Sequence, residues 1–110
     1  MEALFSYGTL QQAQVQLDTF GRYLEGERDV LLGYRIGEVK ITDAAVIQSS
    51  GKDIHPILEF TGVDSDRVDG TVYLLTSEEL AQADHYEVAD YKRVSVLLLS
   101  KRRVWIYAKA

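Results

Sequence analysis

Two short segments of this sequence carry residue types and spacings that could do chemistry. In the first, Leu4 to Leu10, an apolar run stops at a tyrosine and a glycine, and polar residues follow. Glycine adopts backbone conformations that other residues resist, so Gly8 predicts a tight turn from a strand into a helix. The amides of Gly8, Thr9 and Leu10 would then meet at the helix start, where anions and carboxylates bind. The alternative is an ordinary strand-to-helix turn.

The second segment, Ala83 to Val94, contains three acids, one histidine and two tyrosines. Glu87 is a candidate general base if an apolar wall raises its pKa, and otherwise a solvated surface acid. His85 is a candidate acid or base, although a lone histidine beside a helix end more often caps or packs. Arg93 can pair with a carboxylate, and we expect that carboxylate to belong to the domain itself.

Short strands and two helices are expected to position these segments. Apolar residues near helical spacing from Leu10 to Leu24 predict the first helix, with Gly21 as its end. Thr76 and Glu79 form a capping-box pattern that starts a second helix over 77–85. The strands are expected at 3–6, 30–36, 57–60, 67–75, 92–100 and 104–108. Short apolar pieces at 39–41 and 44–47 flank a turn at Thr42-Asp43, and 49–53 is expected to be a loop.

The length of 110 residues fits one domain over residues 1–110. Strands dominate, and helices do not alternate with them. This pattern favours an α+β fold: a small mixed, partly open β-barrel of about six strands with two helices packed outside.

Composition and charge limit the kinds of partner that the chain is expected to bind. A net charge of -5 argues against nucleic acid, and the basic run Lys101-Arg102-Arg103 is expected at a hairpin tip. No apolar run could span a bilayer and no signal-peptide pattern is present, so we expect a cytoplasmic protein without membrane contact. The absence of cysteine excludes disulfides and thiolate zinc sites, and two histidines argue against a histidine-rich metal site.

Six motifs together point to a family. In chain order they are Leu4 to Leu10 followed by a helix, Gly33-Tyr34, Val68-x-Gly70-x-Val72-Tyr73, Asp84-x-Tyr86-Glu87, Tyr91-x-Arg93-x-x-Val96 and Trp105-x-Tyr107. This combination resembles the gamma-glutamylcyclotransferase-like family, including its short bacterial members and the gamma-glutamylamine cyclotransferases. The resemblance runs almost end to end.

The resemblance implies a fold, a reaction and a set of roles. The fold is a small mixed β-barrel with helices outside. The reaction releases 5-oxoproline and an amine or amino acid from a small gamma-glutamyl compound, without metal or organic cofactor. The resemblance makes Glu87 the acid and base, Arg93 a supporting residue, and the turn the cradle of the substrate. The substrate-binding residues would be Tyr7, Gly8, Thr9, Leu10, Tyr91 and Tyr107. The substrate carbonyl oxygen gathers charge and needs donors, and the hydroxyl of Tyr7, Tyr91 or Tyr107 is expected to supply one.

Three matters stay open at the level of sequence. Val88 follows Glu87 where the family usually has glycine, and Gln11 follows the turn where a basic residue is common. The leaving group could be an amino acid, a peptide, a polyamine or the ε-amine of lysine, and the chain a monomer or a homodimer. The rival functions are a non-catalytic module that binds a carboxylated ligand in the same pocket, and an interaction scaffold.

Overall fold

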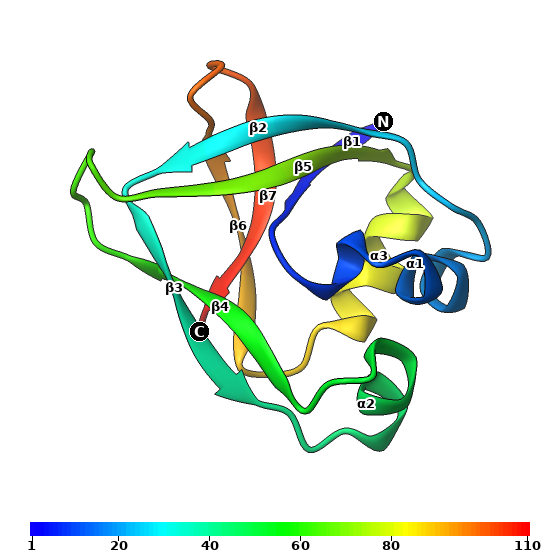
Figure 1. The fold of residues 1–110 in the computed structure, drawn as a ribbon. Coiled ribbons are helices and arrows are strands. Elements are labelled where there is room, and N and C mark those ends of the chain that lie inside the picture. Colours follow the sequence, from blue (N-terminus) through cyan, green and yellow to red (C-terminus); the bar gives the residue numbers. More distant parts are fainter.

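A curled seven-stranded β-sheet has its helices gathered on one side (Figure 1), and the computed structural model describes every residue from 1 to 110. The strands are β1 (Glu2–Ser6), β2 (Gly26–Leu32), β3 (Tyr34–Lys40), β4 (Ile54–Phe60), β5 (Arg67–Leu75), β6 (Tyr91–Leu97) and β7 (Arg103–Lys109). The helices are the short 3-10 helix η1 (Thr9–Gln11), α1 (Ala13–Phe20), α2 (Ala44–Ser50) and α3 (Ser77–Tyr86). The predicted α+β class with a curled mixed sheet is confirmed, with one strand and one α-helix more than expected.

Strand β7 organises the part of the sheet that matters for the site. Its whole length pairs antiparallel with β6. Its other edge is shared, because β1 pairs with it in parallel at Leu4↔Trp105 and β4 pairs with it in parallel at Leu58↔Ala108. The end of β1 therefore lies where the edge of β7 passes from β1 to β4, although these strands are far apart in the sequence.

Strand β1 is fixed by burial on both of its faces. Successive side chains of a strand point to opposite sides, and both Leu4 and Phe5 are 1% exposed. Phe5 packs inside the curl of the sheet with residues that include Leu58 and Ile106. Leu4 packs with Leu80 of α3 in the cluster between sheet and helices. The turn that follows β1 thus starts from a rigid strand.

Two of the predicted helix signals are present in the structure. Thr76 accepts from the amide of Glu79 while the Glu79 side chain accepts from the amide of Thr76, which is the predicted capping box. Helix α1 ends at Gly21, whose φ of 72° is in the left-handed region. The expectation of one continuous helix from Leu10 to Gly21 is wrong, because η1 and α1 divide at Gln12, which has extended backbone angles.

The expected single strand over 30–36 is also wrong. Gly33, with φ of 81°, separates β2 from β3, and its carbonyl accepts from the amides of Thr61 and Gly62. The break lets the two strands reach different partners, since β2 pairs with β5 and β3 with β4. Strand β4 is longer than the expected 57–60 and passes through Pro56, and β6 ends at Leu97, before the expected residue 100.

Helix α2 replaces the expected apolar piece at 44–47 and the first residues of the expected loop at 49–53. Asp43 accepts from the amides of Ala45 and Val46 as an N-cap, and Gly51, with φ of 74°, ends the helix. The basic run lies at the predicted β6–β7 hairpin tip, with Lys101 and Arg102 in the turn and Arg103 opening β7. None of the helices has the length and apolar character needed to cross a membrane.

Candidate active site

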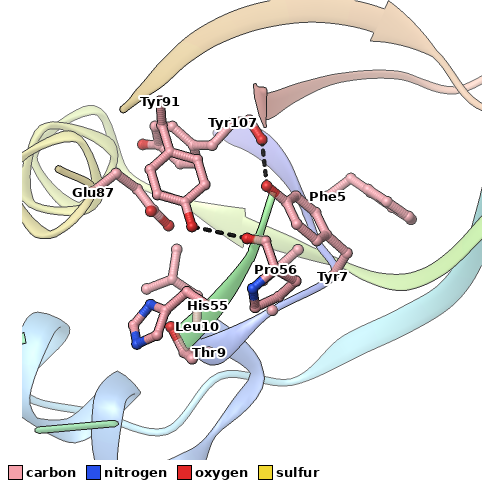
Figure 2. Close-up of a pocket in the computed structure, with 11 residues that line it drawn as sticks. Phe5, Tyr7, Thr9, Leu10, His55, Pro56, Glu87, Tyr91 and Tyr107 are labelled. Carbon is pink, nitrogen blue, oxygen red and sulfur yellow. Dashed lines mark hydrogen bonds between the residues drawn. The ribbon is translucent and has the colours of Figure 1, made fainter. Parts of the chain in front are cut away.

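A small pocket lies where β1 ends, at the place where the edge of β7 passes from β1 to β4 (Figure 2). The Tyr7–Leu10 turn, the start of β4, the end of α3, β6 and β7 all contribute side chains. We call it the inner pocket; its lining residues are Phe5, Ser6, Tyr7, Gly8, Thr9, Leu10, His55, Pro56, Glu87, Tyr91 and Tyr107.

The structure brings together every residue that sequence reasoning expected at the substrate, from three segments of the chain: the Tyr7–Leu10 turn, the segment of Glu87 and Tyr91, and Tyr107 on β7. Arg93, the expected supporting residue, lies outside the inner pocket. Its Nε and Nη2 donate to Asp84 at 2.8 and 3.1 Å, which is the expected internal pair, and its guanidinium lies 4.3 Å from the ring centroid of Trp105. Arg93 thus joins β6 to α3 and β7 beside the pocket.

The turn at Gly8 differs in its cause from the expectation. Gly8 has φ of -128°, outside the left-handed region. Glycine lets the turn approach Pro56 closely, since a Cβ at this position would lie 3.0 Å from the Pro56 ring. The amides of Tyr7 and Gly8 donate to no group of the chain, and η1 starts directly after them. Two adjacent backbone donors are therefore free to bind an anion.

Three tyrosine hydroxyls of the pocket already donate to protein acceptors. Tyr7 donates to the carbonyl of Tyr107 at 2.6 Å, and Tyr91 donates to the carbonyl of Pro56 at 2.8 Å (Figure 2). Tyr107 donates to Oδ1 of Asp84 at 2.7 Å. Each hydroxyl has one hydrogen, which is already donated, so the oxygens of Tyr7 and Tyr91 can interact with a further group only as acceptors. This arrangement suits an ammonium better than the oxyanion for which these hydroxyls were expected to donate.

Glu87 follows the last residue of α3, and Figure 2 shows its carboxyl group directed toward the hydroxyl end of Tyr91. Burial raises the pKa of Glu87 from 4.5 to about 8. Burial, and secondly the charge of Glu87, raise the pKa of both Tyr7 and Tyr91 far above its ordinary value. No cation pairs with Glu87, so this carboxyl can hold or release a proton near neutral pH.

His55 and Pro56 line the inner pocket, and sequence reasoning did not place them there. His55 is 3% exposed, and burial lowers its pKa. Its Nε2 lies 3.0 Å from the carbonyl of Lys52, to which it must donate. No local pattern marks either residue, because only the pairing of β4 with β7 brings them to the turn. The structure groups no three histidine, aspartate or glutamate side chains in a metal-binding cluster.

A hydrogen bond links the turn to the helix end that carries Glu87. The Thr9 hydroxyl, in a residue 7% exposed, lies 2.8 Å from the hydroxyl of Tyr86. Tyr86 directly precedes Glu87, so this bond fixes the distance between the turn and the carboxyl group. Thr9, expected to bind substrate, has its hydroxyl engaged in this bond.

Tyr86→Phe is therefore expected to lower stability by about 1 kcal/mol and to lower the turnover rate of the site several-fold more than its substrate affinity. The measurement is a urea unfolding curve together with kcat and KM. Tyr23→Phe is the matched control, because Tyr23 is 64% exposed. Unchanged kcat in a folded Tyr86→Phe protein would show that the bond does not position Glu87.

Comparisons with known proteins identify the family of the chain. The model of a family described as gamma-glutamyl cyclotransferase, AIG2-like, matches residues 4–110. No curated protein sequence matched.

Solved structures share the fold. The solution structure of one Arabidopsis thaliana protein superposes with a TM-score of 0.73 at 24% identity, over 98% of this chain and 61% of that one. A second Arabidopsis thaliana solution structure gives 0.69 at 23% identity, over 98% and 68%. The crystal structure of an uncharacterized Pyrococcus horikoshii protein gives 0.66 at 15% identity, over 99% and 78%. At these identities the likeness shows the fold alone, and this chain spans less than two thirds of the first structure.

Proposed function

Because the chain belongs to the AIG2-like gamma-glutamyl cyclotransferase family, we propose that it releases 5-oxoproline and a free amine or amino acid from a small gamma-glutamyl compound. One observation carries the proposal. The Glu87 carboxyl, with a pKa raised to about 8 by burial, shares a pocket with the free amides of the turn and the acceptor hydroxyls of Tyr7 and Tyr91.

These groups match the two charges on the glutamyl end of such a substrate. The α-carboxylate would bind the amides of Tyr7 and Gly8, which have no other partner. The α-ammonium would donate to the hydroxyl oxygens of Tyr7 and Tyr91, whose hydrogens point to backbone carbonyls. Holding both groups curls the glutamyl chain, so that its nitrogen approaches its own side-chain carbonyl.

Glu87 would then act first as a base and afterwards as an acid. As carboxylate, it takes a proton from the α-ammonium, and the freed amine attacks the side-chain carbonyl carbon. The amide bond to the leaving nitrogen breaks as Glu87 returns the proton to that nitrogen. The attacking nitrogen then loses a second proton to become the lactam N–H, and the departing amine takes up this proton as it becomes an ammonium, so no water is consumed. A pKa near 8 suits both steps, because the group can accept a proton from an ammonium and donate it again at neutral pH.

The test is release of 5-oxoproline from a panel of gamma-glutamyl amino acids and gamma-glutamylamines. Release from at least one class, with equal release of the amine, is the expected result. If a folded sample releases no 5-oxoproline from any compound of the panel, the proposed reaction is rejected. In that case calorimetry with the same compounds would show whether the pocket is instead a non-catalytic site for a carboxylated ligand.

A further inference from the structure

A second cavity is also lined by Glu87. It has a volume of about 490 Å³ and is lined by Asp84, Glu87, Tyr91, Arg93, Trp105 and Tyr107. We call it the outer recess. Three of its residues, Glu87, Tyr91 and Tyr107, also line the inner pocket. The two cavities are therefore neighbours that share the side chains of these three residues.

The volumes of the two cavities limit which part of a ligand each cavity can hold. The inner pocket encloses about 10 Å³, which is about the room that one water molecule needs. The glutamyl end of a substrate therefore enters the inner pocket only if the turn moves, and no further bulk fits beside it, whereas the outer recess has room for a side chain or an amino acid. The bulky part of a ligand at Glu87 therefore belongs in the outer recess.

The outer recess contains one charged side chain, that of Arg93, with N–H groups that donate to no other group of the chain. Asp84 accepts from Nε and Nη2 of Arg93 and from Tyr107, so its charge is already compensated. Nη1 of Arg93 donates to no group of the chain, and the Arg93 side chain is 28% exposed. Stacking on Trp105 holds the guanidinium plane in place. A fixed, partly desolvated guanidinium with free N–H groups recognises a carboxylate.

We propose that the outer recess is the subsite for the leaving group and that Arg93 selects leaving amines that carry a carboxylate. The proposal rests on the proposed function, in which the leaving nitrogen receives its proton from Glu87. With the glutamyl charges in the inner pocket, the leaving amine extends into the outer recess, toward Arg93. Arg93 is then a specificity-determining residue as well as the partner of Asp84.

Two compounds isolate the carboxylate. Gamma-glutamyl-alanine and gamma-glutamyl-ethylamine differ only by that group on the leaving amine. The native chain is expected to prefer gamma-glutamyl-alanine by about tenfold, both in kcat/KM and in the dissociation constant measured by calorimetry on Glu87→Gln. The double variant Asp84→Asn/Arg93→Gln keeps a neutral hydrogen-bonded pair. In this variant the two compounds should have about equal kcat/KM values and about equal dissociation constants. Asp84→Asn alone frees the guanidinium charge and should strengthen the preference for gamma-glutamyl-alanine.

A second ion pair of the same geometry supplies the control. Arg22 donates to Glu79 through Nε and Nη2 at 2.7 and 2.9 Å, and neither residue lines the inner pocket or the outer recess. Arg22→Gln/Glu79→Gln should therefore keep the native preference. If neither compound is turned over, the proposed function fails, and the calorimetric ratio still decides the subsite. Equal binding of the two compounds, or a preference that survives in Asp84→Asn/Arg93→Gln, would overturn the assignment.

Discussion

Replacing Glu87 with glutamine is expected to reduce 5-oxoproline release by about a thousandfold, with the affinity for the substrate kept within a few-fold. Glutamine has nearly the shape of a protonated glutamate, so the inner pocket should keep its form. It cannot take a proton from the α-ammonium or return one to the leaving nitrogen. The carboxylate and ammonium of the substrate still find the amides of Tyr7 and Gly8 and the hydroxyls of Tyr7 and Tyr91. The measurement pairs kcat with calorimetric binding.

Glu78→Gln is the matched control, because Glu78 is an exposed residue of the same helix, α3, and lines neither the inner pocket nor the outer recess. Its kcat should equal that of the native chain. A Glu87→Gln protein that releases 5-oxoproline at the native rate would remove Glu87 from the reaction. Loss of binding together with turnover would instead assign the residue to holding the substrate.

The fold was predictable wherever a local signal decides the structure. The capping box of Thr76 and Glu79 and the stop at Gly21 act within a few residues, and both occur where they were expected. Helix α2 had such a signal in Asp43 and Gly51, but Thr42-Asp43 was interpreted as a turn alone. The break at Gly33 depends on pairing to β4 and β5, which are distant in the sequence. A periodicity argument has no access to such partners.

The site shows the same division. Resemblance to a family singled out the turn and Glu87, and the structure places them around one pocket. His55 and Pro56 reach that pocket only because β4 succeeds β1 along β7. The directions of the tyrosine hydroxyls also depend on backbone carbonyls of distant strands, namely those of Tyr107 and Pro56. Sequence reasoning therefore found the residues and misjudged which of them have hydrogens to give.

Glu87→Gln is also expected to stabilise the protein, by an amount that grows with pH. The unfolded chain releases the Glu87 proton near its ordinary pKa of 4.5, whereas the folded chain keeps it up to about 8. Between these values the folded state binds more protons than the unfolded state, so the free energy of unfolding of the native chain falls as pH rises. The shift corresponds to at most about 5 kcal/mol, and the partial exposure of Glu87 reduces the expected loss to about 2–3 kcal/mol.

Urea unfolding of the native chain and Glu87→Gln, measured side by side from pH 4 to pH 9, isolates this contribution because all other titrating groups are shared. The two proteins should be about equally stable near pH 4, where both side chains are neutral. At pH 8 the free energy of unfolding of the variant should exceed that of the native chain by about 2–3 kcal/mol. A difference that does not change with pH would mean that Glu87 titrates normally in the folded chain. The carboxyl would then be solvated, and it would lose the property that lets one group take a proton from an ammonium and return it to a leaving amine.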